Sequence, residues 1–386
     1  MIASLASDQI LRRFDNLETG ELTLTTPDGK TRVFQGKKPG SKAVLKLHDW
    51  RVVSNLASRG NIGLADDYRF GHWDTDDLQN LVLLGLQNKG ALRQMISGNS
   101  IFRRLSALSY LLRMNTLKGS KKNIHAHYDL GNDFYKLWLD ETMTYSSAIY
   151  KHPHDTLTQA QHQKYDRIID ELDTSSGNLL EIGCGWAGFA DRALQRGDYS
   201  IKGITLSEEQ HRYGQQRLGN TANIALEDYR LQDGLYDRIV SIEMFEAVGE
   251  RFWPQYFGKV RSLLKSNGKA IIQTITMNER DFPAYRQGGD FIRSYIFPGG
   301  MLPSPSAFRK SAASAGLRAQ NEFFFGQDYA RTLTEWLHAF DQKKDDVKNL
   351  GFDDSFIRLW RFYLAACAAA FRSGHINVMQ TELRHA

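Results

Sequence analysis

The stretch LLEIGCGWAG, residues 179–188, determines which fold this chain can adopt. It runs from an apolar segment into three glycines at the spacing G-x-G-x-x-G, and a helical pattern follows over residues 187–197. Glycines at this spacing let the backbone turn tightly between a strand and a helix and approach a ligand closely. We therefore expect a nucleotide-type turn at the edge of a sheet.

Strands and helices alternate along the chain on both sides of this turn. Helical patterns cover residues 156–172, 187–197 and 207–219, and apolar strand patterns cover 178–185, 200–206, 237–244 and 269–277. Such alternation is typical of a parallel, doubly wound α/β sheet. Two later helical segments, 332–351 and 354–374, are expected to pack over the sheet and the ligand site. The sequence predicts that this domain covers residues 119–386.

The ligand of the glycine turn is indicated by the position of acidic residues. A dinucleotide site usually has an acidic residue about 20 residues after the turn, at the end of the next strand, to bind the ribose. Here that strand ends in Gly203-Ile204-Thr205-Leu206-Ser207, without an acid, whereas Glu181 stands two residues before the first glycine. A nearby carboxylate suits the positive sulfonium of S-adenosylmethionine. The sequence therefore favours S-adenosylmethionine over NAD.

The N-terminal third of the chain has a different pattern. Residues 20–34 alternate around a Pro-Asp-Gly turn, which predicts a hairpin, and 41–50 read as a further strand. A helical pattern follows over 75–88, after the cap-like Thr75. These elements predict a small α+β domain over residues 1–118, which ends at the loop 119–123.

Positive charge is concentrated in this N-terminal region. The chain carries 49 Lys+Arg and 44 Asp+Glu, net +5, and residues 78–128 hold eight basic residues and no acidic one. Within that range, 101–114 reads as a basic amphipathic helix, and the loop with Lys118, Lys121 and Lys122 follows. Such a segment suits an anionic membrane surface, although an ordinary surface helix remains the alternative. No zinc-finger or RNP-type pattern supports nucleic-acid binding.

The composition excludes several other classes of protein. Only Cys184 and Cys367 occur among 386 residues, which excludes a disulfide framework and indicates an intracellular protein. The first residues carry charge where a secretory signal needs an apolar region. The apolar runs 81–86 and 363–371 are shorter than the roughly 20 residues that span a bilayer. The pairs His125/His127 and His152/His154 lack a third ligand at a recognisable spacing, so no metal site is predicted.

Six blocks of the sequence together resemble one protein family. They are HYDLGNDFYKLWLDETMTYSSAIY (127–150), LLEIGCGWAGFA (179–190), GITLSEEQ (203–210), DRIVSIEMFEAVG (237–249), YIFPGGMLPS (295–304) and LAACAAAFR (364–372). Their order and content resemble the cyclopropane-fatty-acyl-phospholipid synthase family, which includes the mycolic acid cyclopropane synthases. The N-terminal domain is similar in role to the lipid-docking domain of that family.

This resemblance implies a class I methyltransferase fold and a reaction. The family transfers a methyl group from S-adenosylmethionine to the cis double bond of an unsaturated acyl chain in a membrane phospholipid. We therefore expect a cytoplasmic enzyme that is peripheral on the inner membrane face, with a homodimer as one option for its assembly. The residues that match the family's cofactor contacts are Tyr145, Ser146, Gly183, Gly185, Thr205, Leu206, Gln210, Asp228 and Tyr229.

The resemblance also implies how a proton is removed after methyl transfer. In the family the base is a bound bicarbonate, held by a Cys, a Glu, a His and a Tyr. The matching residues here are Ser147, Glu246, Gln273 and Tyr329, and Ala247 replaces a further His. Ser147 and Gln273 can still donate hydrogen bonds to an anion, and Glu246 can itself accept a proton if burial raises its pKa. Methyl transfer is thus expected, while the product is either a cyclopropane or a methyl-branched or methylene chain.

A few other side chains are candidates for the chemistry. Cys367 matches the family's active-site cysteine, although a buried cysteine in an alanine-rich helix is usually a core residue. Aromatic faces can stabilise a carbocation, and the candidates are Tyr145, Tyr295, Phe297 and Tyr329. The turn 297–300 and Pro303 are expected to form a lid or channel lip.

Two other functions stay open from the sequence. One is a methyltransferase that acts on a soluble small molecule, which the basic 78–128 stretch disfavours. The other is a lipid-binding protein without catalytic activity, which the residues at 147, 273 and 247 would allow.

Overall fold

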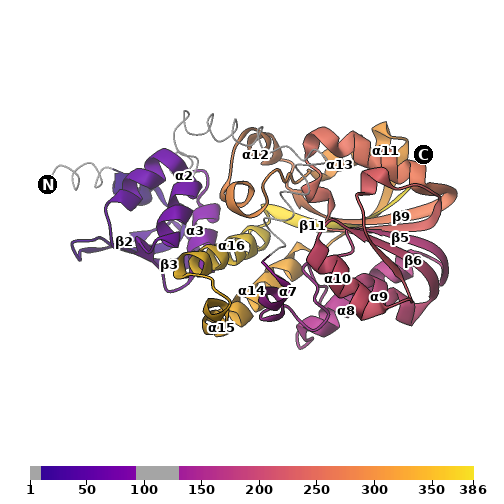
Figure 1. Ribbon diagram of the computed structural model, residues 1–386. Helices are drawn as coiled ribbons and strands as arrows, with labels where there is room; N and C mark the ends of the chain where they lie inside the picture. The colour runs from indigo at the N-terminus through magenta and orange to yellow at the C-terminus, as the bar shows by residue number, and fades with distance from the viewer. Residues whose placement is uncertain (1–9, 93–129) are drawn as a thin grey trace. The chain divides into compact units, whose positions relative to one another are not determined.

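A computed structural model describes residues 10–92 and 130–386 of the chain (Figure 1). The described residues fall into two compact units. Unit 1 contains residues 10–92, 287–296 and 336–375, and unit 2 contains residues 130–286, 297–335 and 376–386. The basic segment 101–114 and the lysines of the following loop lie outside the described residues.

Unit 2 is built on a seven-stranded sheet with the order β10-β11-β9-β8-β5-β6-β7. Five strands run parallel: β5 (Ser176–Ile182), β6 (Asp198–Thr205), β7 (Asn223–Leu226), β8 (Tyr236–Ile242) and β9 (Leu264–Met277). Two antiparallel strands, β11 (Ile376–His385) and β10 (Leu317–Phe324), extend the sheet beyond β9. The expected doubly wound α/β fold is therefore confirmed, with an antiparallel edge that the sequence patterns did not predict.

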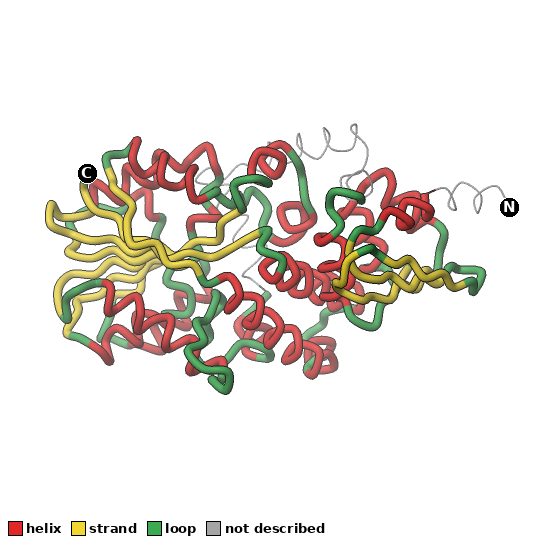
Figure 2. The backbone as a smooth tube through the Cα atoms, turned by 180° about the vertical axis from the view of Figure 1, so that it is seen from behind, coloured by secondary structure: helices red, strands yellow, loops and turns green. Residues whose placement is uncertain are grey.

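Helices cover both faces of this sheet (Figures 1 and 2). One face carries α8 (Leu157–Glu171), α9 (Gly188–Arg196) and α10 (Glu208–Leu218), and the other carries α11 (Trp253–Leu263) and α13 (Pro305–Ser314). The two faces bury separate apolar clusters, one around Ile168 and Ala190, the other around Phe257 and Phe308. Short segments near the strand ends are α7 (Asn132–Lys136), α12 (Phe282–Gln287), η2 (Tyr229–Leu231), η3 (Phe245–Ala247) and η4 (Glu250–Phe252).

The side on which successive strands join the sheet reverses at β5. From β5 the chain adds β6 and β7 on one side, and it then returns to add β8 and β9 on the other side. In open parallel sheets, ligands bind outside the carboxyl ends of the strands at such a switch point. The glycine turn follows β5 directly, so the fold places it at this position.

Unit 1 contains a small sheet and three principal helices. The sheet has the order β2-β1-β3-β4, with β1 (Thr19–Thr25), β2 (Thr31–Gln35), β3 (Lys38–Leu47) and β4 (Trp73–Asp74). The helices are α2 (Arg51–Arg69), α3 (Leu78–Gln87) and α16 (Asp354–Arg372), and shorter helical segments are η1 (Arg12–Asn16), η5 (Ile292–Ile296) and α15 (Lys344–Asn349). The predicted hairpin over 20–34 is confirmed, because β1 and β2 pair antiparallel.

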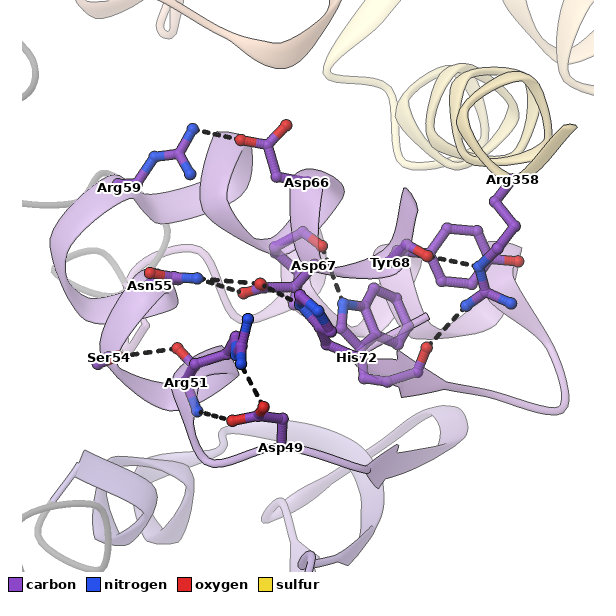
Figure 3. A network of polar contacts seen from close by, with 12 residues as sticks. Asp49, Arg51, Ser54, Asn55, Arg59, Asp66, Asp67, Tyr68, His72 and Arg358 are labelled. Atoms are coloured by element: carbon purple, nitrogen blue, oxygen red, sulfur yellow. Dashed lines mark hydrogen bonds and ion pairs between the residues drawn. The ribbon is translucent and has the colours of Figure 1, made fainter. Parts of the chain in front are cut away.

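Polar contacts attach α16 to the N-terminal segment (Figure 3). The Arg358 guanidinium donates to the carbonyl oxygens of Tyr68 and Trp73, pairs with Asp74 at 2.8 Å, and lies 4.0 Å from the Tyr68 ring centroid. In α2 the chain departs from helical geometry at Gly60, and Asn55 spans this break by donating to both carboxylate oxygens of Asp67. Unit 1 is therefore a packed unit in which a C-terminal helix is an integral part.

Several expectations about the elements of unit 1 differ from the structure. Helix α16 was expected to cover the large sheet, but it packs on α2 and α3, because its apolar face buries Trp360 and Phe362 within unit 1. Unit 1 thus draws on three segments of the chain, rather than on residues 1–118 alone. Helix α3 is capped by Asp77 and not by Thr75, since the Asp77 carboxylate accepts from the Asn80 N–H. Helix α2 was not predicted, because its central glycine interrupts the pattern.

Candidate active site

A cavity of about 150 Å³ lies at the switch point of the large sheet. Its wall combines the glycine turn after β5, the end of β6, the start of α10 and the segment after β8. Eight of the nine residues predicted to bind the cofactor line it: Tyr145, Ser146, Gly183, Gly185, Thr205, Leu206, Gln210 and Tyr229. The structure therefore brings residues from four separate sequence blocks to one site.

The glycine turn forms one side of the cavity. Gly183 and Gly185 have φ angles of +80° and +52°, in the left-handed region that favours glycine. A Cβ atom on Gly183 would lie 2.8 Å from the Met244 Cγ, whereas one on Gly185 would meet no atom within 4 Å. The N–H groups of Gly183 and Cys184 donate to the Ile204 carbonyl, which fixes the turn on β6. The space beside Gly185 is thus kept open for a ligand.

Hydrogen bonds fix the part of the cavity wall formed by the end of β6 and the start of α10. The Thr205 hydroxyl donates to the Gln210 side-chain oxygen at 2.8 Å, and Ser207 caps α10. Asp228, the ninth predicted residue, does not line the cavity itself. It forms a buried ion pair at 2.6 Å with Arg230, which does line the cavity. Asp228 therefore contacts a cavity-lining residue rather than the cavity itself.

An aromatic cluster stands beside the predicted contact Tyr145. The Tyr145 ring centroid lies 5.5 Å from those of Tyr135 and Trp138, and Tyr135 lies 4.8 Å from Trp186 of the glycine turn. The Trp186 indole N–H donates to Asn132 at the start of α7. Sequence reasoning did not single out Tyr135 and Trp138, although both lie within the 127–150 block.

A buried carboxylate faces the same cavity from β5. Glu181 is 2% exposed, and its Oε2 atom is buried without a hydrogen-bond partner among the described residues. Burial raises the pKa of Glu181 well above its ordinary value, while Lys164 opposes that shift. An unpaired carboxylate oxygen fits a ligand that carries positive charge, as S-adenosylmethionine does. Together with the open space beside Gly185, Glu181 makes this cavity suitable for that cofactor.

The carboxylate of a second glutamate, Glu243, accepts hydrogen bonds from three of the residues that were expected to hold an anion. Its Oε1 accepts the Ser147 N–H at 2.8 Å and the Gln273 side-chain N–H at 2.7 Å. Its Oε2 accepts the Tyr329 hydroxyl at 2.6 Å. Glu243 lines the cavity, and its φ of +51° is unusual for a residue other than glycine. Sequence reasoning missed Glu243, although an acid at the end of β8 was a usable signal.

Glu246, which was expected to help hold the bicarbonate or to accept the proton itself, lies nearby in a different environment. Its Oε1 accepts the Thr274 hydroxyl at 3.0 Å and the Ile275 N–H, whereas its Oε2 is buried without a partner in the described part of the chain. Burial and the adjacent charge of Glu243 raise the pKa of Glu246 to about 8. Burial also raises the pKa of Glu243, but Tyr329 and Ser147 oppose the shift by hydrogen bonding. A pKa of about 8 keeps Glu246 mostly protonated at neutral pH, whereas the three hydrogen bonds donated to Glu243 favour its ionised form.

Comparisons with known proteins agree with this geometry. Residues 115–381 match the family described as mycolic acid cyclopropane synthetase. The chain is 37% identical over 351 residues to the tuberculostearic acid methyltransferase UfaA1 of Mycobacterium tuberculosis, covering 86% of this chain and 81% of the relative. It is 34% identical over 350 residues to the cyclopropane-fatty-acyl-phospholipid synthase of Escherichia coli strain K12, covering 88% and 87%.

The chain belongs to the mycolic acid cyclopropane synthetase family. A solved structure of the mycolic acid cyclopropane synthase CmaA1, complexed with SAH and CTAB, matches with a TM-score of 0.64 and 32% identity, over 68% of this chain and 97% of that one. As a member of this family, the protein is an S-adenosylmethionine-dependent methyltransferase, and the cavity beside the glycine turn is its candidate cofactor site.

Two of the predicted residues lie in the other unit. Cys367 is on α16 in unit 1, whereas the cavity and the Glu243 cluster belong to unit 2. Burial raises the pKa of Cys367 to about 12, so this thiol stays protonated at neutral pH. Tyr295 also belongs to unit 1, where its ring packs against Phe291. Neither Cys367 nor Tyr295 is among the residues that line the cavity.

The turn expected to form a lid lies beside Glu246. The Gly300 N–H donates to the Phe297 carbonyl at 3.0 Å, and the Met301 N–H donates to the Glu246 carbonyl at 2.9 Å. Both residues of the pair His125/His127 lie outside the described residues. In the ranges that are described, no cluster of three or more metal-ligating side chains occurs, and no helix is long and apolar enough to cross a bilayer.

We expect the replacement Glu246→Gln to stabilise the protein at high pH. The pKa of Glu246 is raised to about 8 in the folded protein, so between its ordinary value and pH 8 only the unfolded chain releases this proton. Stability from this group is therefore lost as the pH rises, and glutamine removes that loss. Urea unfolding should show the variant more stable than wild type by several kcal/mol, up to about 4–5 kcal/mol, at pH 8.5 and similar to it at pH 4.5. Equal stability at both pH values would mean that Glu246 is ionised in the folded protein.

Proposed function

We propose that this enzyme transfers a methyl group from S-adenosylmethionine to the cis double bond of an unsaturated acyl chain in a membrane phospholipid. The cofactor cavity and the family membership support S-adenosylmethionine as the methyl donor. The names of the relatives support a lipid acyl acceptor, because one is a tuberculostearic acid methyltransferase and another a cyclopropane-fatty-acyl-phospholipid synthase. The basic stretch 78–128 supports a phospholipid surface as the place of reaction.

The observation that carries this proposal is the position of Glu243. Ser147, Gln273 and Tyr329 match family positions that hold a bicarbonate, and here all three donate to the carboxylate of Glu243. These contacts support a role for the protein's own carboxylate as the base that the family takes from bicarbonate. A lipid-binding relative without catalytic activity would have no use for a carboxylate supplied with three donors beside the cofactor cavity.

Each part of the site has a chemical role in this reaction. S-adenosylmethionine supplies an electrophilic methyl group when it is bound. Since an alkene is a weak nucleophile, the site must orient it and exclude water. The aromatic side chains around Tyr145 present faces that stabilise a carbocation without reacting with it. Glu243 then accepts the proton that the acyl cation loses, as a general base.

The product depends on which proton Glu243 removes. Loss of a proton from the new methyl group, with a bond formed to the cationic carbon, gives a cyclopropane. Loss from an adjacent chain carbon gives a methyl-branched alkene. A hydride shift that moves the cation to the methyl-bearing carbon, followed by loss of a methyl proton, gives a methylene chain. We favour an open-chain product, because the bicarbonate site that serves ring closure in the family is altered at both Ser147 and Gln273.

The test is to incubate purified full-length enzyme with S-adenosylmethionine and vesicles of monounsaturated phosphatidylglycerol. Release of S-adenosylhomocysteine, together with a mass gain in the acyl chain, is the expected result. Derivatisation and mass spectrometry of the fatty esters then separate ring, branched and methylene products. Saturated phosphatidylglycerol is the matched control, since it lacks the double bond. Release with saturated and unsaturated vesicles alike, or release only with soluble substrates, would contradict the proposal.

A further inference from the structure

Lys164 is a buried lysine next to the active site that the proposed reaction does not use. It lies on α8, is 0% exposed, and is one of two buried lysines in the described ranges, with Lys269. Its ammonium group donates to the Ser146 hydroxyl at 2.6 Å and lies 4.1 Å from the Tyr165 ring centroid. A charged group is rarely placed so deeply without a counter-charge, because desolvation of an ion is costly.

Side chains of helix α8 hold the peptide group between Ser146 and Ser147, whose N–H donates to Glu243. Gln161, one turn before Lys164, donates its side-chain N–H to the Ser146 carbonyl at 2.9 Å. The same peptide bond presents the Ser147 N–H, which donates to Glu243 at 2.8 Å. Gln161 and Lys164 therefore hold the backbone and the side chain of Ser146, and this arrangement directs the next N–H at the carboxylate.

The charges around Lys164 indicate its second role. Its ammonium group acts electrostatically on carboxylates from three different elements: Glu243 after β8, Glu181 on β5, and Asp140 in the loop after α7. Burial lowers the pKa of Lys164 to about 7, and the charge of Glu243 is the largest effect that opposes this. Conversely, Lys164 lowers the pKa of Glu243. The other charged or titratable groups that face these residues are Glu246, Tyr329, Tyr165, Cys184 and Arg217.

We propose that Lys164 is a positioning residue for the base: it holds Ser146 and supplies the buried positive charge that keeps Glu243 ionised. This inference rests on the proposed function, in which Glu243 must be deprotonated to accept a proton. It also links the two halves of the site, because Ser146 lines the cofactor cavity and Ser147 contacts the base.

The test compares pH profiles of kcat/KM for wild type and three variants, with S-adenosylhomocysteine release as the readout. Lys164→Gln keeps a hydrogen-bond donor but removes the charge, and it should move the acid limb of the profile upward by about one pH unit. Ser146→Ala keeps the charge and should leave that limb in place, whatever it does to cofactor affinity. Lys269→Gln removes the other buried lysine, which pairs with Glu382, and should not move the limb. An acid limb in Lys164→Gln that coincides with the wild-type limb would overturn the proposal.

A second measurement requires neither substrate nor activity. Thermal unfolding of Lys164→Met, Glu243→Gln and the double variant forms a double-mutant cycle. If Lys164 acts through the charge of Glu243, the double variant should lose clearly less stability than the sum of the two single losses. Additive losses, or failure of both Lys164→Met and the double variant to fold, would assign Lys164 a purely structural role. Absence of methyl transfer by the wild type would reject the proposed function alone, because this cycle would still report on Lys164.

Discussion

Replacement of Glu243 by glutamine is expected to lower kcat about 10³-fold, because glutamine cannot accept the proton that the acyl cation must lose. Glutamine keeps the size of the side chain and one acceptor oxygen, so the cavity and the contact with Tyr329 can persist. Cofactor affinity should therefore change by no more than about fivefold, since a single neutral contact is worth about 1 kcal/mol. Single-turnover release of S-adenosylhomocysteine and equilibrium binding of S-adenosylmethionine measure the two effects separately.

Glu246→Gln is the matched control for this variant. Both residues are glutamates of the same segment after β8, but Glu246 has a pKa raised to about 8 and already holds a proton at neutral pH. Its replacement by a neutral glutamine should therefore cost less than about tenfold in kcat at pH 7. If Glu246→Gln were inactive and Glu243→Gln retained activity, the proton acceptor would be Glu246 and not Glu243.

The second large effect is expected when Glu243 is replaced by glycine. Glycine adopts the φ of +51° at this position without strain, and its lack of a side chain leaves the Ser147 N–H, the Gln273 amide and the Tyr329 hydroxyl without their acceptor. Three convergent donors form an anion site, which bicarbonate can enter. We expect Glu243→Gly to lose about 10³-fold in kcat, as for the glutamine variant, and to recover about 10- to 100-fold with added bicarbonate.

Three controls define this rescue. Glu243→Gln should not respond to bicarbonate, because glutamine fills the space that the anion needs. Chloride at equal ionic strength should not rescue Glu243→Gly, because it is not a useful base. The wild-type enzyme should be indifferent to removal of bicarbonate from the buffer, and strong dependence of the wild type on bicarbonate would show that Glu243 does not occupy the base position.

The cofactor half of the site was largely predictable from the sequence. The turn around Gly183 and Gly185 joins one strand to the next helix, so its chemistry is local and is visible as glycine spacing. Eight of nine predicted contacts line the cavity, and the ninth, Asp228, forms an ion pair with the cavity-lining Arg230. The antiparallel strands β10 and β11 were not predictable in the same way, because β11 pairs with β9 across about a hundred residues of chain.

The base half of the site could not be assembled from the sequence. Ser147, Gln273 and Tyr329 were selected through the family resemblance, but their common partner was expected to be a bicarbonate ion, held together with Glu246. The contacts to Glu243 span 96, 30 and 86 residues of sequence, and no local pattern distinguishes two glutamates three positions apart. Likewise, Lys164 is an unremarkable member of the helical segment 156–172 until its burial is known.

By itself, the sequence determined the doubly wound sheet, the glycine turn, the family and its methyl donor, because periodicity, turn chemistry and ordered motifs are properties of neighbouring residues. Only the tertiary structure decided which carboxylate the anion-site residues surround, which one holds a proton, and to which unit α16 and Cys367 belong. The physical reason is that charge state and partnership depend on burial and on contacts between distant segments, which the packing of β8, β9 and α8 creates.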